Sequence, residues 1–192
     1  ILFYVTNYNK KRGLKLRFLS QKFKMTLYIR YFGLLKVPMI FYCRPSVQDI
    51  SSKSVVVKIP FLRRNRNHLG SMYLGALCVG ADITSALLSL SIIKKSGKKI
   101  LPIFKDFKAD YYKRAEGDVH FVCNQGEEIQ NMINEVIKNK VRINKKIDVL
   151  AYVPSKLDKE VAAAAASLAA PVCAAASAAA AVAASAAAGA AA

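Results

Sequence analysis

The chain has 192 residues, which is enough for one domain with a proper core and too few for two full domains without crowding. It carries 30 Lys and Arg residues against 12 Asp and Glu residues, and residues 1–66 contain 15 basic residues and one acid, Asp49. Such a segment attracts polyanions, but charge alone does not choose among phosphate-rich ligands, nucleic acid and an anionic membrane surface.

Residues 1–46 are predicted to form a basic, partly amphipathic N-terminal extension. Within it, Leu14 to Leu35 predicts a weak basic amphipathic helix, which either packs on the domain or makes peripheral contact with a membrane surface. The chain opens at Ile1 without the features of a secretory signal, so we expect either a fragment or an upstream read-through in which Met25 is the true start.

A strand is predicted over residues 54–61, because Val55, Val57 and Ile59 alternate along it. A polar connection, residues 63–68, follows. Residues 71–93 are the most apolar stretch and carry one charge, Asp82. This stretch is long enough to span a bilayer, but a carboxylate at its centre would cost about 2.5–3.5 kcal/mol there. We therefore predict a helix buried inside a soluble protein.

A second strand is predicted over residues 99–112, after a stop at Gly97. Its shared face is predicted to contain Ile103, Phe107, Ala109 and Tyr111. The turn sequence at residues 116–118 and a short strand at residues 119–124 follow, so we predict that the two strands form a hairpin.

A second helix is predicted after Gly126, with acids at its start and lysines at its end, which matches the helix dipole. Alternating apolar residues predict a strand over residues 142–153, and a last strand is expected to begin near Lys159.

The last 32 residues, after Glu160, carry no charge and are mostly Ala. They indicate either a low-complexity helical tail or positions written as Ala whose side chains are not known. We predict a domain over residues 47–168 and an Ala-rich tail over residues 169–192.

No metal site is predicted, because neither His68 nor His120 has a neighbouring ligand at the required spacing and the cysteines form no close pair. Free thiols in a reducing cytoplasm are the simpler interpretation of the cysteines, which are Cys43, Cys78, Cys123 and Cys173.

The predicted order is strand, long apolar helix, two strands, helix and two strands. This order favours an α+β fold in which an antiparallel sheet wraps around one central helix, with one extra helix inserted before the last strands. Three segments sharpen the prediction: Arg64–Gly75 with Asp82 beyond it, Ile103–Ala109, and Arg114–Phe121. Together they resemble hotdog-fold thioesterases of the phenylacetic-acid-pathway type. They are closer still to a bacterial thioesterase-like family that also occurs as the C-terminal half of an acetyltransferase fusion.

The resemblance implies an acyl-CoA or acyl carrier protein thioester hydrolase without a cofactor. Asp82 would act as general base or nucleophile, Asn67 would orient the water or the thioester carbonyl, and amides near Gly75 would bind the oxyanion. Asp82 lies seven residues after Gly75, so both should face one side of the helix. A buried carboxylate has a raised pKa, which suits a base.

Two further groups are expected to bind the substrate. The loop and helix-start residues are His68, Gly70, Ser71 and Tyr73; the basic residues expected to meet the CoA phosphates are Arg64, Arg66, Lys105 and Arg114.

Hotdog pockets form between two subunits, so the resemblance implies a homodimer or homotetramer, and the free thiols favour the cytoplasm. Tyr73 stands where many relatives carry His, and Leu74 where they carry a first glycine. A module that binds acyl thioesters without cleaving them is therefore the alternative. Nucleic-acid binding by the basic segment is a third hypothesis, without a recognised motif to support it.

Overall fold

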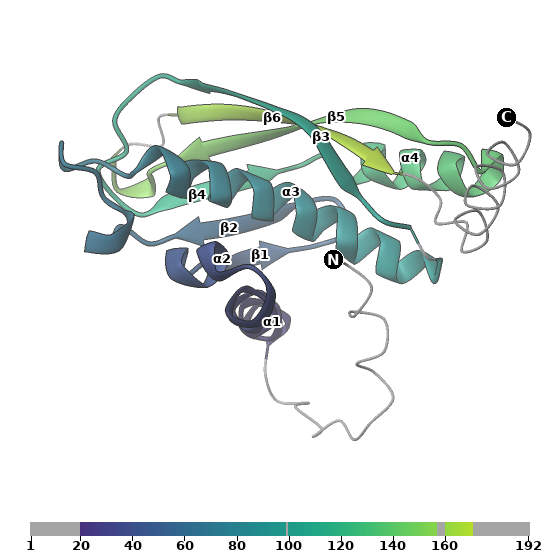
Figure 1. Ribbon diagram of the computed structural model, residues 1–192, viewed down its shortest axis with the longest axis horizontal. Coiled ribbons are helices and arrows are strands. Elements are labelled where there is room, and N and C mark those ends of the chain that lie inside the picture. Colours follow the sequence, from purple (N-terminus) through teal and green to yellow (C-terminus); the bar gives the residue numbers. More distant parts are fainter. Residues whose placement is uncertain (1–19, 99, 157–159, 171–192) are drawn as a thin grey trace, which may run out of the picture.

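The computed structural model describes residues 20–98, 100–156 and 160–170, and Figure 1 shows the arrangement of their helices and strands. The helices are α1 (Gln21–Lys36), α2 (Pro38–Cys43), α3 (Leu74–Ser96) and α4 (Gly126–Asn139), with 3-10 turns η2 (Arg63–Asn65) and η3 (Pro154–Lys156). The strands are β1 (Ser46–Ile50), β2 (Val55–Ile59), β3 (Ile103–Tyr111), β4 (Val119–Cys123), β5 (Ile143–Tyr152) and β6 (Glu160–Ala170).

The six strands form one antiparallel sheet in the order β1-β2-β4-β5-β6-β3. α3 lies across one face of this sheet, as Figure 1 shows, and contacts β2, β4 and β5. The predicted α+β hotdog arrangement is confirmed, and α4 is the predicted extra helix before the last two strands.

The central strands bury alternate side chains, as their sequences predict. Val55, Val57 and Ile59 of β2 are fully buried, and β4 and β5 follow the same alternation. These side chains pack beneath α3. The helix can approach closely at Gly80, where an added Cβ would lie 2.3 Å from the ring of Phe121 on β4.

α3 is a core helix. By length and composition it is the one helix in the described residues that could cross a membrane, and 67% of its most apolar 18-residue window is buried by the protein. Its buried hydroxyls are satisfied locally, since Thr84 donates to the carbonyl of Gly80 at 2.6 Å. The helix ends, as predicted, at Gly97, whose φ of 66° favours glycine.

The predicted hairpin of residues 99–124 is wrong. β3 pairs with β6 at the edge of the sheet, whereas β4 lies between β2 and β5. The inward side chains of β4 are fully buried and require a central position, while β3 is exposed along most of its length and suits an edge. Adjacency in sequence favours pairing only as a tendency, and burial decides here.

The predicted common face of β3 also needs correction at one residue. A bulge between Phe104 and Asp106 adds one residue to the strand, so the alternation changes sides there. Phe104 therefore packs against the core together with Ala109, whereas Ile103 is 49% exposed.

α1 packs against the β1 edge of the sheet, and α2 contacts α1, α3 and η2. Ile29 and Gly33 of α1 are buried, and the hydroxyl of Thr26 accepts a hydrogen bond from the N–H of Val47 at 2.8 Å. The predicted helix of residues 14–35 therefore packs on the domain where the structure describes it, as α1. Residues 14–19 lie outside the described residues. The predicted domain, residues 47–168, begins one residue into β1, after both of these helices.

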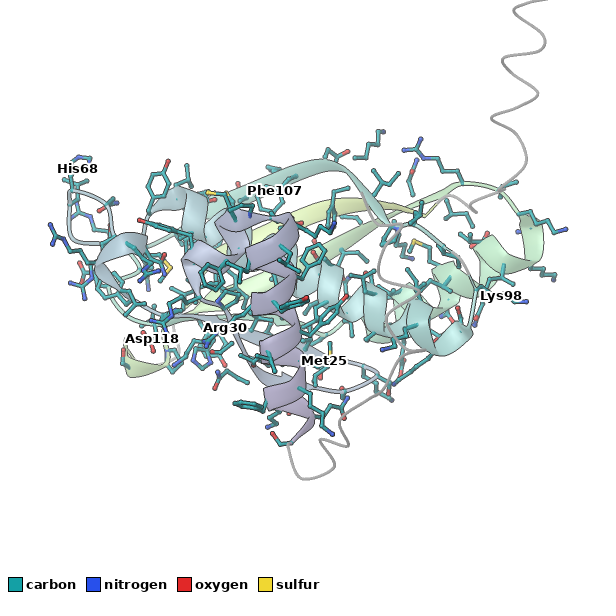
Figure 2. All side chains as sticks on the ribbon, turned by 60° about the horizontal axis from the view of Figure 1, so that its bottom comes forward. Met25, Arg30, His68, Lys98, Phe107 and Asp118 are labelled. Atoms are coloured by element: carbon teal, nitrogen blue, oxygen red, sulfur yellow. The ribbon has the colours of Figure 1, made fainter. Side chains whose placement is uncertain are left out.

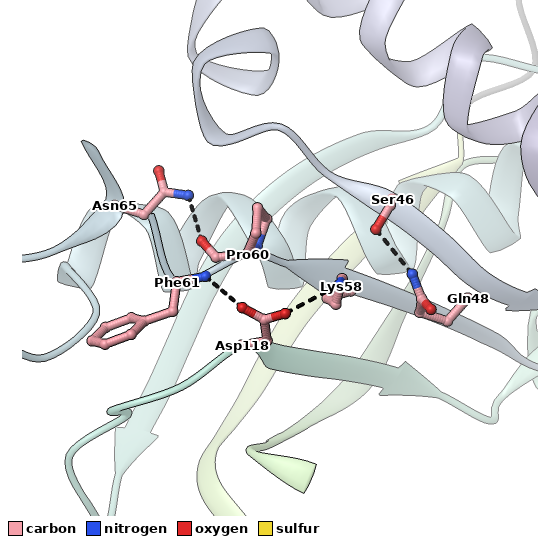
Figure 3. Close-up of polar contacts among 7 residues, drawn as sticks. All are labelled: Ser46, Gln48, Lys58, Pro60, Phe61, Asn65 and Asp118. Atoms are coloured by element: carbon pink, nitrogen blue, oxygen red, sulfur yellow. Dashed lines mark hydrogen bonds and ion pairs between the residues drawn. The ribbon is translucent and has the colours of Figure 1, made fainter. Parts of the chain in front are cut away.

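Asp118 ties the start of β4 to the segment after β2 (Figure 3). Its carboxylate accepts the N–H of Phe61 at 2.8 Å and pairs with the ammonium of Lys58 at 3.1 Å. The pKa of this carboxyl lies below its ordinary value of 3.8, mainly because of the hydrogen bond from the N–H of Phe61 and to a smaller extent because of Lys58. Next to it, the buried amide of Asn65 donates to the carbonyls of Pro60 and Cys43.

We expect Asp118→Asn to lower the free energy of unfolding by about 1 kcal/mol at neutral pH, because charge-assisted hydrogen bonds are lost at a partly exposed site. The folded pKa is depressed, so this stabilisation is present above the unfolded pKa and is lost as the pH falls through the folded value. Urea unfolding of both proteins should show a difference that narrows in acid. A difference that stays constant with pH would contradict this explanation.

Candidate active site

The loop before α3 is built around Asn67. Its Oδ1 accepts hydrogen bonds from the N–H groups of Leu69 at 2.9 Å and Ser71 at 3.1 Å, and its Nδ2 donates to the hydroxyl of Ser71 at 3.0 Å. Gly70 has a φ of 73°, which only glycine adopts readily. Both ends of the Asn67 amide are therefore engaged in shaping this loop.

Asn67→Ala should lower the free energy of unfolding by about 2 kcal/mol, because it removes several hydrogen bonds from a partly buried turn. Asn67→Asp is the matched control, since it keeps an acceptor for the two backbone N–H groups and should lose less. Urea unfolding, with hydrogen exchange at Leu69 and Ser71, measures both effects. Equal losses in the two variants would show that the acceptor does not shape the loop.

A cleft of about 350 Å³ opens between this loop, the start of α3 and the end of β3. Its floor is apolar, with Met72 and Leu77, and its rim carries the cations of Lys113 and Arg114. The residues that line it are Asn67, Ser71, Met72, Leu74, Leu77, Tyr111, Tyr112, Lys113, Arg114 and Ala115. An elongated ligand with an apolar part and an anionic end suits this lining.

α3 continues from the cleft with a stripe that the sheet does not cover. Gly75, Cys78 and Asp82 follow one another at helical spacing along it, as predicted for Gly75 and Asp82. The Sγ of Cys78 lies 3.3 Å from the hydroxyl of Tyr111, a residue of the cleft. Asp82 is one turn beyond Cys78, so its side chain lies about 5–6 Å further along the same face.

Asp82 is exposed in the single chain, whereas the sequence predicted a buried acid. The residues on either side of it in sequence, Ala81 and Ile83, are buried, whereas the stripe with Asp82 faces away from the sheet. Water reaches the carboxylate, but the surrounding protein removes part of its hydration, and this desolvation raises its pKa above 3.8. The pKa of Asp82 is therefore shifted upwards, the direction that suits a general base.

The ring of Tyr73 covers the start of α3 at Gly75. A Cβ added to Gly75 would lie 2.6 Å from a ring carbon of Tyr73, whose side chain is 54% exposed. The amides of Ala76 and Leu77 donate to the carbonyl of Tyr73, at 2.9 and 3.2 Å. Access to the helix start thus depends on where this exposed ring lies.

The structure brings only some of the predicted binding residues to the cleft. Ser71 and Arg114 line it, but His68 lies at the tip of the loop and points away from the body of the molecule (Figure 2). Lys105 lies six residues before Tyr111 on β3, a distance of about 20 Å in an extended strand.

The predicted arginines of the connection lie elsewhere. Arg66 stacks over the ring of Phe61 at 4.1 Å and donates to its carbonyl, and Arg64 lies over the ring of Tyr42 at 5.4 Å. The residues that sequence reasoning missed are Tyr111, Tyr112 and Lys113, which reach the cleft because β3 crosses to the far edge of the sheet. The aromatic pair before Lys113 is visible in the sequence, but a hairpin of β3 with β4 would place the pair elsewhere in the sheet.

Metal ligands do not gather in the part of the chain that the structure describes: there is no group there of three or more His, Cys, Asp or Glu residues. Its three cysteines, Cys43, Cys78 and Cys123, are free thiols.

A family described as "Domain of unknown function (DUF4442)" matches residues 28–170, which include every described strand and the site. The chain belongs to the DUF4442 family. Its predicted membership of a hotdog thioesterase-like family is confirmed.

Solved structures similar to this DUF4442 protein share its fold at low sequence identity. A Pseudomonas aeruginosa protein described as a probable thioesterase is 21% identical with a TM-score of 0.65, covering 76% of this chain and 95% of its own. A Chlorobaculum tepidum protein of unknown function is 12% identical with a TM-score of 0.67, covering 78% and 96%. A Haemophilus influenzae thioesterase is 9% identical with a TM-score of 0.54, covering 73% and 87%. No curated protein matches the DUF4442 chain.

Proposed function

We propose that this DUF4442 protein hydrolyses acyl thioesters, with acyl-CoA or acyl carrier protein thioesters as substrates. The observation that carries the proposal is the carboxylate of Asp82, with its raised pKa, on the uncovered stripe of α3 that leads from the cleft. Structural neighbours named thioesterases support the reaction class.

In the proposed reaction Asp82 takes a proton from a water molecule, and the water oxygen bonds to the thioester carbonyl carbon. The carbon–sulfur bond then breaks, and the thiol leaves with the proton held by Asp82. The N–H of Gly75 has no acceptor within the described residues, so it is free to stabilise the oxyanion once Tyr73 moves aside. The reaction needs no cofactor.

The proposed substrate fits the cleft in two parts. The apolar floor of Met72 and Leu77 would hold the acyl or pantetheine chain, and the cations of Lys113 and Arg114 would meet the CoA phosphates. Arg114 is thus retained from the sequence prediction, whereas Arg64, Arg66 and Lys105 are not needed for it.

We further propose that a second copy of the chain completes the site. β3 is an open edge of the described sheet and exposes Ile103, Phe107 and Tyr111 between 41% and 49%. Pairing there would cover the stripe of α3 that ends at Asp82, and would bring Asp82 of one protomer towards the Asn67 loop of its partner.

One observation favours a second candidate function, that of an acyl-thioester-binding module without turnover: the ring of Tyr73 over Gly75. The test incubates the full chain with acyl-CoA thioesters and follows both released thiol and bound ligand. Turnover supports the hydrolase, while tight binding without release supports the binding module.

A further inference from the structure

α1 carries two apolar stripes on opposite sides. Ile29 and Gly33 point into the protein, whereas Phe23, Leu27, Tyr31 and Leu34 are spaced by three or four residues on the other side and are 51–54% exposed. A helix on the surface of a soluble protein normally has polar side chains on its outer face. The packing of residues 20–98, 100–156 and 160–170 therefore does not explain the outer stripe of α1.

α2 extends this apolar surface. It packs against α1 where Gly33 meets the backbone of Phe41, and it exposes Met39, Phe41 and Tyr42 by 54%, 42% and 51%. We call the combined surface the α1–α2 face; its residues are Phe23, Leu27, Tyr31, Leu34, Leu35, Met39, Phe41 and Tyr42. Contiguous apolar surfaces of this kind mark sites of protein or membrane contact.

Three arginines surround a cavity of about 300 Å³ at the margin of the α1–α2 face. Arg30 of α1, Arg44 after α2 and Arg64 of η2 line it together with Phe41. Figure 2 views the molecule with α1 in front and Arg30 beside it. Arg30 donates to the carbonyl of Pro45 at 3.0 Å, which fixes its guanidinium in this cluster.

Among the residues that the structure describes, the cluster has no negative partner. In the described residues none of Arg30, Arg44 and Arg64 forms an ion pair with an acid, and residues 20–48 contain no Asp or Glu. Desolvation, and then the charge of Arg44, lower the pKa of Arg30. These cations repel one another, and an anion in the cavity would relieve the repulsion.

We propose that the α1–α2 face docks on a bilayer that contains anionic phospholipids, with its apolar and aromatic side chains in the headgroup region and a lipid phosphate in the cavity of Arg30, Arg44 and Arg64. Aromatic and basic side chains together are suited to the membrane–water interface. The proposal is independent of the hydrolase function.

Geometry and charge favour a bilayer over a second copy of the chain. A symmetric dimer through the α1–α2 face would bring its arginines towards those of its partner, without acids between them. The face also lies beside β1, at the opposite edge of the sheet from β3 (Figure 1), so docking would leave the cleft open.

The test is co-sedimentation of the full chain with vesicles of phosphatidylcholine alone or mixed with phosphatidylserine. The wild type should sediment with the anionic vesicles, and less so as salt is raised. Leu27→Glu/Leu34→Glu should lower the partition coefficient at least tenfold, while Val141→Glu, at an equally exposed apolar residue elsewhere, should not.

The cavity is tested with Arg30→Gln/Arg44→Gln/Arg64→Gln. Its partition onto anionic vesicles should fall on the order of 100-fold, at about fivefold for each cation near the surface. The matched control removes three other cations, with Lys138→Gln/Lys140→Gln/Lys145→Gln, and should change it little. Circular dichroism and thermal unfolding confirm that each variant folds.

Three results would overturn the proposal. The first is a wild-type chain that does not sediment with anionic vesicles, or whose binding none of the α1–α2 variants lowers. The second is binding of inorganic phosphate to the arginine cavity without any vesicle binding. The third is a wild-type oligomer that Leu27→Glu/Leu34→Glu dissociates, because that outcome assigns the face to a second copy of the chain.

Discussion

Asp82→Asn should lower kcat for thioester hydrolysis about 10²- to 10⁴-fold, the usual contribution of a positioned general base. The same variant should unfold at an equal or higher temperature. The folded pKa of Asp82 is raised by desolvation, so the ionised carboxylate opposes folding, and stability falls as the pH rises from the unfolded to the folded pKa. A neutral amide removes this penalty.

The control for this prediction is Asp148→Asn, which makes the same chemical change at an exposed carboxylate on β5. Its thioester hydrolysis should match that of the wild type. Loss of activity together with a lower melting temperature in Asp82→Asn would instead indicate that Asp82 supports the structure rather than the reaction.

The pH profile follows from the same pKa. A general base must be ionised, so kcat/KM of the wild type should fall as the pH drops through the raised pKa of Asp82. This acid limb should lie above 3.8, the ordinary value for Asp. Asp82→Asn should lose the limb along with most of its activity.

Gly80→Ala should lower the free energy of unfolding by about 1–3 kcal/mol, as overpacking of a full core does. Intrinsic helix propensity predicts the opposite sign, a gain of about 1 kcal/mol. Packing prevails because the added Cβ would lie 2.3 Å from the ring of Phe121, a residue that is 1% exposed on β4, between β2 and β5. Urea unfolding measures the change.

Two variants separate this clash from other effects. Phe121→Leu combined with Gly80→Ala should cost less than the sum of the two single changes, because the smaller side chain leaves room for the methyl group. Gly75→Ala, in the same helix, meets only the exposed ring of Tyr73, which can move, so its loss should be small. Additive losses would rule out the clash at Phe121.

Elements that bury one face along their own length were predictable from the sequence. The alternation of Val55, Val57 and Ile59 predicts β2. The acids in the first turn of α4 and the lysine in its last turn match the helix dipole and predict that helix. Pairing is not predictable in the same way, because it depends on how far the neighbouring strands and α3 bury the inward face of each strand, and β4 is buried there whereas β3 is mostly exposed. Sequence order therefore pairs β3 with β4 wrongly, and it does not predict the bulge beside Phe104.

The site was predictable where it follows local order along the chain. Asn67, Ser71, Gly75 and Asp82 lie on one loop and the helix after it, so their spacing alone placed them near one another. The cations were not predictable, because Arg64 and Arg66 turn towards the rings of Tyr42 and Phe61. The exposure of Asp82 depends on which side of α3 the sheet leaves open, and the sequence of the helix does not contain this.

The most direct test of the proposed function is the rate of thiol release from saturating acyl-CoA by the wild type and by Asp82→Asn, with ligand binding measured in parallel. We predict turnover by the wild type, and a variant that still binds the thioester but releases thiol at least 100-fold more slowly. Equal rates in the two proteins, or binding by the wild type without release, would contradict a hydrolase that works through Asp82.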